Sequence, residues 1–497
     1  TWLGLPYAEG LLEDFSGRYG YDLVERMGDL FGPVDEPAAQ RTRVHFYRLL
    51  AERFGQSYAG GQRAWCDAHS VALTGHCLGE EAFYTQVRMG GDLWEVMKHF
   101  TIPGIDMLSN ADGFTYPHGT AFYGDIDRRA FHLTCKLVHG IVRHSGGREM
   151  LSEAYGVCDW GLNLQRQKCG FNYQVALGVT LFNDNSLITS VADFRKYVIG
   201  GKHFTQPWWQ HYGNYAEYNA RLAAFHAEAE PHCDVGVLYP RSTMWALADQ
   251  AALGVSWLIN APAGPQSALQ FQIYELLDEL IREQWHFDLL FEPVLEQAKV
   301  GEGGSLVTEY TQYRALVVPS ATMLPRACFE QIKVFAQAGG TVVFTGDLPK
   351  TEVESLAGLA AEVEQLLELP TVSHVEGSGA AVRGELARYI RRPLTIEGEG
   401  AREFVSSWRR IANLDAFYVA NMAQSPVDVT IGMGIEGSVT VLAPDTMECY
   451  RPPVGDGFSW HFEPWQGYLL LVGEGLDVGE AVLEEVDGRP EPVVMVH

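Results

Sequence analysis

A chain of 497 residues has room for two to four domains, and 47% hydrophobic with 20% charged residues is typical of a globular rather than a disordered protein. The formal net charge of −27 excludes nucleic acid and anionic membrane surfaces as expected partners, because both require basic patches. No run of 18 apolar residues is present, so no transmembrane helix is predicted.

The first zone, residues 1–231, alternates helical patterns with short apolar runs. Helices are predicted at 11–31, 41–70, 90–100, 130–146 and 162–178, and strands at 71–75, 102–109, 148–156 and 178–186. This alternation predicts βα units around a parallel sheet, that is, a (β/α) TIM-type barrel. The chain opens at Thr1 without a Met, and about 230 residues are few for eight βα units. We therefore expect a barrel that is incomplete on its N-terminal side, or whose first strands are absent from this chain.

The second zone, residues 232–370, changes character. Apolar strands are predicted at 233–240, 287–292, 314–320 and 339–346, with helices at 246–253, 271–284 and 327–339. This pattern predicts an open α/β domain of the flavodoxin-like or glutamine-amidotransferase-like type, to which no nucleotide is assigned because it has no glycine-rich phosphate loop. In the third zone, residues 371–497, the helical patterns fade and alternating runs predict an antiparallel β-sandwich accessory domain.

Eight cysteines are scattered along the chain, and no two of them have the C-x-x-C spacing. This usage predicts free, mostly buried thiols rather than a zinc site or a redox motif. Free thiols are typical of a reducing compartment, so a cytoplasmic location is expected.

The first chemistry-bearing stretch is TGHCLGEEAF, where His76, Glu80 and Glu81 follow a predicted strand. The carboxyl ends of barrel strands form the catalytic face, and adjacent carboxyls in a confined site raise each other's pKa, which suits one of them to donating a proton. The alternative interpretation is that both glutamates merely occupy the first turn of the next helix, where acids favour the helix dipole.

The second stretch is LSEAYG, in which Glu153 lies at another strand end. Two carboxyls from different strand ends of one barrel can face each other across a sugar. The second then acts as a nucleophile at about 5 Å separation, or activates water at roughly 6.5–9.5 Å. The alternative is an ordinary surface acid.

A third polar strand end, NDNS, contributes Asn183, Asp184 and Asn185, which could bind sugar hydroxyls or a hard cation such as calcium, or simply form a turn. The aromatic segment 203–219 contains Trp208 and could be a sugar platform or helix packing. His118, His132, His139 and His144 show no metal-ligand spacing as a group. The substrate-binding candidates are His76, Asp106, His118, Tyr155, Trp160, Asn183, Asp184, Asn185 and Trp208.

The order of these stretches resembles glycoside hydrolase family 106, the α-L-rhamnosidase-like enzymes. The resemblance rests on GYDL (20–23), TGHCLGEE (74–81), GGDLWEVMKHFTIPGIDML (90–108), LSEAYG-x3-WGLNLQRQK (151–168), FRK (194–196), PWW (207–209) and DVGVLYP (234–240). It covers roughly residues 1–240. The second zone is similar to the trimerisation domain of family 42 β-galactosidases, which makes a homo-oligomer a candidate state.

The resemblance implies an inverting hydrolysis by two glutamates, with calcium near the sugar in some members. Carried over to this chain, the acid is Glu80 or Glu81 and the second carboxylate is Glu153, while His76 and Asp106 contact sugar hydroxyls or orient a carboxyl. Where the family pattern has GVN followed several residues later by His, this chain reads GVTLFNDNS, with Thr180 and Asn185 in those parts of the pattern. The sugar subsite is therefore expected to differ.

Three function hypotheses follow. The first is a glycoside hydrolase acting on an α-L-rhamnoside-like or related glycoside. The second is a catalytically inactive carbohydrate-binding or scaffold protein that retains the fold, and the third is a retaining β-galactosidase-like enzyme. All three have a carbohydrate as partner.

Overall fold

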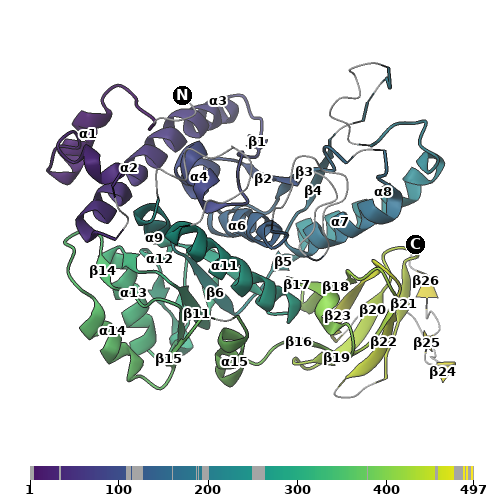
Figure 1. Cartoon of the computed structure of the whole chain (residues 1–497). Coiled ribbons are helices and arrows are strands. Elements are labelled where there is room, and N and C mark those ends of the chain that lie inside the picture. The colour runs from purple at the N-terminus through teal and green to yellow at the C-terminus, as the bar shows by residue number, and fades with distance from the viewer. Residues whose placement is uncertain are drawn as a thin grey trace.

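The computed structural model describes most of the chain. It covers residues 5–32, 35–107, 114, 127–158, 160–185, 187–188, 190–192, 201–248, 264–377, 379–453 and 457–474, and the backbone of three short segments at 485–486, 489–490 and 494–495. In these ranges the protein has a mixed α/β architecture with two larger parallel sheets and two larger antiparallel ones (Figure 1).

The first parallel sheet is a curled half-barrel of four strands in the order β1-β2-β3-β4. Its strands are β1 (Thr74–Gly75), β2 (Ile102–Met107), β3 (Leu151–Ala154) and β4 (Leu181–Asp184). Ile105 and Met107 are fully buried in the core against the helices, so by the alternation of a strand Asp106 points to the opposite, concave face. The sheet therefore presents one side for packing and the other for a site.

Helices surround this sheet, some before it in the chain and others between or after its strands. They are α1 (Leu11–Tyr19), α2 (Pro37–Phe54), α3 (Gly61–Ala68), α4 (Phe83–Gly90), α5 (Leu93–Met97), α6 (Ala130–His144), α7 (Leu164–Ala176) and α8 (Tyr212–Glu228), with the turns η1 (Met27–Leu30) and η4 (Trp209–His211) and the π-helical segment η2 (Gly55–Gly60).

Two predicted helices are interrupted by glycines. The helix predicted over 11–31 ends as α1, because Gly20 adopts a left-handed conformation with φ 75° and its N–H donates to the Ser16 carbonyl. The helix predicted over 90–100 is shorter in the structure: α4 ends at Gly90, and α5 covers Leu93–Met97. Between them Gly91 has φ 78°, and a Cβ there would lie 2.9 Å from the Ala51 side chain. Asp92 then caps α5 by accepting from the Trp94 N–H at 3.2 Å.

The second parallel sheet has the order β15-β13-β11-β6-β7, which counted along the chain is the doubly wound order 2-1-3-4-5. Its strands are β6 (Val235–Tyr239), β7 (Phe287–Phe291), β11 (Ala315–Pro319), β13 (Thr341–Thr345) and β15 (Val372–Val375). β6, β7, β11 and β13 are buried along their whole length, which explains their near-continuous apolar sequences. The accompanying helices are α9 (Arg241–Ala246), α11 (Pro265–Arg282), α12 (Glu292–Leu295), α13 (Arg326–Gln337), α14 (Ala360–Leu367) and α15 (Gly379–Tyr389).

Helical structure thus continues past residue 370 as far as Tyr389, where the sequence pattern had suggested β structure. The helix predicted over 246–253 lies mostly outside the described residues, and its described part is the end of α9. Short elements complete this part of the chain: β8 (Lys299–Val300), η5 (Glu302–Gly304), β9 (Leu306–Val307), β10 (Gln312–Tyr313), β12 (Met323–Leu324) and β14 (Thr351–Glu352).

The C-terminal part forms two antiparallel sheets that share a core. One sheet contains β16 (Leu394–Glu397), β19 (Val427–Met433) and β22 (Phe458–Phe462). The other contains β5 (Glu230–Pro231), β17 (Phe404–Ile411), β18 (Leu414–Asn421), β20 (Ser438–Leu442), β21 (Glu448–Tyr450), β23 (Gly467–Gly473) and β26 (Val494–Met495). The turn η6 (Ala401–Glu403) precedes β17, and β24 (Glu485–Val486) pairs with β25 (Arg489–Pro490). Phe404, Phe417 and Leu470 of the larger sheet lie in one hydrophobic cluster with Ile431 and Phe462 of the smaller sheet.

The three parts meet in the middle of the molecule (Figure 1). β5, which comes from the segment after α8, pairs with β17 through Pro231 and Arg409. The largest buried cluster runs from Leu11 through α6 and α11 to Leu469, so it crosses from the half-barrel into both other parts. None of the helices in the described ranges combines the length and the apolar character that a bilayer crossing requires.

Candidate active site at the carboxyl edge of the half-barrel

The carboxyl ends of the four half-barrel strands bring together residues that are far apart in sequence. Asp106 of β2 is in register with Glu153 of β3, and Glu153 is in register with Asn183 of β4. His76 follows β1 directly. The edge predicted to carry the chemistry therefore holds a histidine, two acids and an amide on neighbouring strands.

Glu153 is held by two donors. His76 donates from Nε2 to Glu153 Oε2 at 2.9 Å, and Asn185 donates from Nδ2 to Glu153 Oε1. The Glu153 side chain remains 27% exposed and that of His76 23% exposed. The carboxylate is thus fixed in orientation and still open to a ligand.

His76 lies between two carboxylates. Its Nδ1 is 3.4 Å from Glu80 Oε1, while its Nε2 contacts Glu153. Burial by itself lowers the pKa of His76, but the facing Glu80 carboxylate outweighs burial and raises this pKa to about 10. At neutral pH the ring is therefore a cation that donates from both nitrogens.

Glu80 is the most enclosed acid of the group, with only 1% of its side chain exposed. Within the described residues neither of its carboxyl oxygens accepts a well-formed hydrogen bond. Burial and repulsion by Glu80 raise the pKa of Glu81 to about 8. The same two causes raise the pKa of Asp106 to about 7, and Asp106 Oδ1 is buried without a partner among the described residues. Near neutral pH both Glu81 and Asp106 can hold a proton.

The loop that carries Glu80 and Glu81 is held by its backbone. Thr85 donates to the Gly79 and Ala82 carbonyls at 2.7 Å each, and Gln86 donates to the Glu80 carbonyl at 2.7 Å. Helix α4 begins only at Phe83 and has no acid in its first turn, so the alternative of a dipole-favouring first turn is wrong for both glutamates. Their side chains are free to face His76.

The end of β4 forms a second group around a buried lysine. Asp184 forms an ion pair with Lys202 and accepts from the Tyr212 hydroxyl at 2.7 Å. Lys202 Nζ also lies 4.4 Å from the centre of the Tyr155 ring, and the Tyr155 and Tyr215 hydroxyls are 2.8 Å apart. Tyr155 is fully buried and supports this edge through Lys202. Sequence reasoning missed Lys202, since the surrounding segment stood out only for its aromatic residues.

The other predicted residues lie around this edge with less contact to it. The Trp160 ring is 39% exposed and edge-on to His203, and Trp208 lies against Trp209 and Tyr212. Thr180 is buried at the start of β4, where it bonds the Met150 backbone. His118 lies outside the described residues.

The three other histidines named in the sequence are structural by their contacts. His132 bonds Asp278 at 3.1 Å, His139 approaches Asp288 at 3.3 Å and His144 lies 3.1 Å from the Tyr313 hydroxyl.

A calcium ion does not fit the NDNS stretch well. The carboxylate of Asp184 is already paired with Lys202, and the amide of Asn185 donates to Glu153. Within the described residues no group of three or more His, Cys, Asp or Glu side chains is arranged to hold a metal ion. We therefore derive no step through a metal.

Comparison with solved structures places this fold. Its structural neighbours are glycoside hydrolases. A rhamnosidase from Novosphingobium sp. PP1Y matches with a TM-score of 0.66 and 13% identity over 97% of this chain and 44% of that chain. Gan42B, a GH42 β-galactosidase from G. stearothermophilus, matches with a TM-score of 0.64 and 10% identity over 94% of this chain and 76% of the other. A GH42 exo-carrageenase from Bacteroides ovatus matches with a TM-score of 0.60 and 13% identity over 95% of this chain and 64% of that chain.

At 10–13% sequence identity, these matches establish the fold alone. The chain spans less than half the length of the rhamnosidase and about three quarters of the β-galactosidase. No protein-family model matches the sequence, and no curated protein matches it. The likeness to family 106 in particular stays a resemblance, whereas a fold of the glycoside hydrolase type is shared with all these structures.

Proposed function

We propose that the protein is a glycoside hydrolase acting on an α-L-rhamnoside-like or related neutral glycoside, with Glu153 as a reacting carboxylate. The observation that carries this proposal is the state of Glu153. It is exposed on the carboxyl edge of a parallel half-barrel, oriented by His76 and Asn185, and close to acids that hold protons near neutral pH. An oriented carboxylate beside a proton donor is what glycosidic cleavage requires.

The proton donor has two candidates that imply different stereochemistry. Asp106 is the in-register neighbour of Glu153, and adjacent strands are about 4.8 Å apart, close to the separation of about 5 Å in retaining enzymes. Of the two acids expected from sequence, Glu80 lies on the opposite side of the His76 ring from Glu153 and Glu81 follows Glu80 in the chain, which favours the wider separation of roughly 6.5–9.5 Å found in inverting enzymes. An inverting reaction with Glu80 or Glu81 as the acid is what the sequence resemblance implies, and the raised pKa of Glu81 favours Glu81 as the donor.

Product stereochemistry separates these two pairs. Proton NMR of the first-formed sugar shows an inverted anomer if Glu81 or Glu80 works with Glu153, and a retained anomer if Asp106 does. Asp106→Asn and Glu81→Gln, assayed on the same aryl glycoside, then identify which acid the rate requires. A wild-type chain that hydrolyses no glycoside in a broad aryl-glycoside panel would contradict the proposal as a whole.

Electrostatics favour a neutral substrate. Two acids, Glu80 and Glu153, face the one cationic ring of His76, and Glu81 and Asp106 add negative charge when they lose their protons, so the edge carries an excess of acidic groups. An anionic sugar would be repelled from such an edge. The rhamnosidase among the structural neighbours supports a deoxyhexose, and the GH42 β-galactosidases support the retaining alternative.

A non-catalytic carbohydrate-binding protein is the second candidate. It is favoured by one observation: the His76 ring occupies the space between Glu80 and Glu153, where a glycosidic bond would lie if those two were the catalytic pair. Calorimetric titration with the hydrolysis substrates distinguishes the two, since binding without turnover supports this candidate. Calcium dependence also stays a prediction from resemblance, and dialysis against EDTA followed by calcium addition tests it.

The two parts of the chain that follow the half-barrel also receive an assignment. We propose that the doubly wound part is flavodoxin-like and provides a homo-oligomer contact, and that the two antiparallel sheets form a β-sandwich accessory domain. The strand order supports the flavodoxin-like assignment and the shared core supports the sandwich, while the oligomer contact rests on the resemblance to family 42. Analytical ultracentrifugation of the chain tests the oligomer, and a monomer at micromolar concentration would contradict it.

A further inference from the structure

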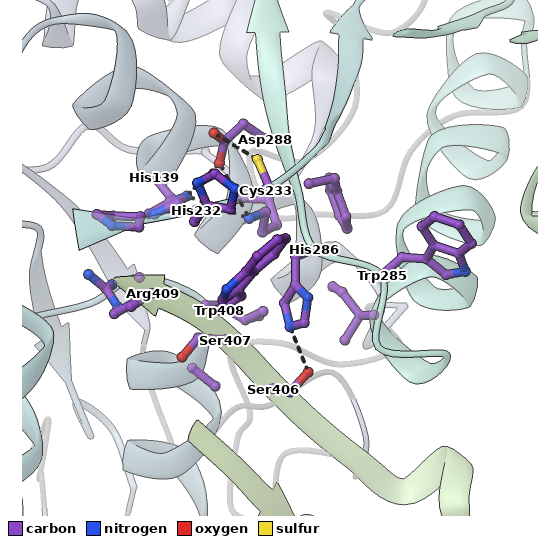
Figure 2. A pocket seen from close by; sticks show the side chains of 17 residues that line it. His139, His232, Cys233, Trp285, His286, Asp288, Ser406, Ser407, Trp408 and Arg409 are labelled. Carbon is purple, nitrogen blue, oxygen red and sulfur yellow. Dashed lines mark hydrogen bonds and ion pairs between the residues drawn. The ribbon is translucent and has the colours of Figure 1, made fainter. Parts of the chain in front are cut away.

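A small polar cavity lies where the three parts of the molecule meet, away from the half-barrel edge. Figure 2 shows that Ser406, Ser407, Trp408 and Arg409 reach it from one strand, β17, while His286 and Asp288 come from the β7 region. The cavity has a volume of about 40 Å³. A water molecule needs roughly 10–15 Å³ of such space, so there is room for one chloride-sized ion or a few waters.

The charges around this cavity do not balance. Asp288 is 2% exposed and is the carboxylate that lines it. Lys136 and Arg143, both from α6, lie 4.0 Å and 3.1 Å from Asp288 oxygens. Arg409, only 3% exposed, is a third buried cation, and it donates to the carbonyls of His226 and Ala229 rather than to a carboxylate.

Asp288 has little capacity left to neutralise a further cation. Besides Arg143 and Lys136, its oxygens lie 3.3 Å from His139 Nδ1 and accept from Cys233 Sγ and the Tyr313 hydroxyl at 3.2 Å each. Asp288 is thus the one lining carboxylate for three largely buried basic side chains, of which Lys136 and Arg143 lie against it while Arg409 donates to backbone carbonyls. Burying an uncompensated charge is costly, so a compensating anion or the loss of a proton is required.

Two N–H groups at the cavity have no partner among the described residues. They are Nε of Arg409, which always carries a hydrogen, and Nδ1 of His286, which carries one in the tautomer whose Nε2 accepts from the Ser406 hydroxyl at 3.1 Å. Both residues line the cavity, together with Lys136 and the Ser407 hydroxyl. Unpaired donors that are buried beside an excess of positive charge are a binding site for an anion rather than for a cation or an apolar group.

Two further cavities adjoin this one. A second cavity of about 210 Å³ shares His139, Gly178, Pro231 and Arg409 with it, and continues past Arg148 and Tyr310. A third, of about 380 Å³, shares Arg143 and Tyr310 with the second. The junction cavity thus adjoins larger spaces whose lining includes the exposed Tyr310.

From this geometry we propose that the junction cavity binds one small monovalent inorganic anion, chloride in ordinary buffers, between Arg409, Lys136 and His286. The anion neutralises the cation that Asp288 leaves unpaired, and it ties β17 to α6 and β7. Its role is structural, and it is independent of the glycosidase proposal because no residue of the half-barrel edge takes part.

Bromide is the probe for a direct test. Crystals of the full chain are soaked in sodium bromide, and anomalous differences are collected at the bromine edge. We expect a bromide peak inside the cavity at hydrogen-bond distance from Arg409 Nε. Peaks only at exposed Arg or Lys side chains would mean an adventitious ion only, and would overturn the proposal.

Thermal unfolding in solution is a second test of the anion site. Thermal unfolding is followed in sodium chloride and in sodium gluconate at equal ionic strength, and chloride should raise the midpoint by roughly 1–3 °C. Arg409→Gln should abolish this difference. Arg410→Gln is the matched control, because Arg410 is the next residue on the same strand but points outward to Asp415, and it should keep the difference.

If Arg409→Gln does not fold, the unfolding midpoints of the wild-type chain and of Arg410→Gln in the two salts still test whether chloride binds. Equal midpoints in both salts, together with water alone in the cavity, would overturn the proposal. They would mean that Lys136, whose pKa burial lowers, relieves the charge by losing its proton.

Discussion

The His76 Nε2 atom lies 2.9 Å from Glu153 Oε2, although 76 residues separate the two in the chain. The same ring faces Glu80 on its other side. One cation therefore orients the acid proposed to react and compensates an acid that is almost completely buried. The activity and the stability of this edge are coupled through a single side chain, which determines how both respond to mutation and pH.

Glu153→Gln should remove turnover and keep sugar binding. The amide cannot act as nucleophile or base, and loss of such a group lowers kcat by about 10²–10⁴-fold. Initial rates on an aryl glycoside and calorimetric binding of the same compound measure the two effects separately. Glu217→Gln, at an exposed position of α8, is the control and should keep the wild-type rate. A Glu153→Gln chain that hydrolyses as fast as wild type would refute the role given to Glu153.

His76→Leu should destabilise the fold by about 3–5 kcal/mol, because it leaves the buried Glu80 carboxylate without its counter-ion. Adding Glu80→Met should recover a large part of this loss, since the pair is then replaced by apolar groups. Denaturant unfolding of both single variants and the double variant gives the coupling free energy. His461→Leu, which breaks a pair with the exposed Asp428, should cost less than about 1 kcal/mol. Additive losses in the double variant would show that His76 and Glu80 do not interact.

Stability should decrease as the solution becomes alkaline. The pKa of His76 is raised from 6.5 to about 10, so the folded state holds its proton more tightly than the unfolded state. The stabilisation is complete below pH 6.5 and is lost between pH 6.5 and 10, by up to a few kcal/mol. Unfolding free energies measured across this range should fall for wild type and change less for His76→Leu. Parallel curves for the two proteins would contradict the raised pKa.

The rate should also depend on pH through its proton donor. Burial and Glu80 raise the pKa of Asp106 to about 7 and that of Glu81 to about 8, so a donor at either position loses its proton above those values. We expect kcat/KM to fall on the alkaline side from about pH 7 if Asp106 is the acid, and from about pH 8 if Glu81 is. The profile is measured with an aryl glycoside whose leaving group needs protonation. A rate that is unchanged up to pH 9 would exclude both acids.

Lys202→Met should destabilise the fold, measured as the free energy of unfolding in denaturant. It leaves Asp184 with only the Tyr212 hydroxyl as its partner, and because Asp184 is about a quarter exposed the expected loss is about 1–3 kcal/mol. Lys202→Met combined with Asp184→Asn should be more stable than Lys202→Met alone. Lys350→Met, which breaks an exposed pair with Asp347, should change stability by less than about 1 kcal/mol. Equal losses at positions 202 and 350 would show that the buried pair has no special weight.

Local pattern predicted most of the strands that build the site. The runs around IPGIDM, LSEA and LFND were identified as strands from their apolar residues and polar ends, and the structure pairs them in parallel as β2, β3 and β4. The four apolar runs from DVGVLY to TVVFT were likewise identified, because strands buried on both faces have continuous apolar sequences. Helix ends were predicted less well, because local pattern does not reveal that Ala51 of another helix lies against Gly91 and leaves no room for a side chain there.

What depends on tertiary structure is which side chains meet. Nothing in the spacing of His76, Glu80 and Glu153 predicts that one ring contacts both acids, because that contact requires the curl of the sheet and the loop held by Thr85 and Gln86. Lys202 reaches Asp184 by the same kind of convergence, and Arg409 and Asp288 reach one cavity from strands more than a hundred residues apart. Secondary structure follows from residues that are neighbours in the chain. The electrostatics of both sites follow from the burial of charges among residues that are neighbours only in space.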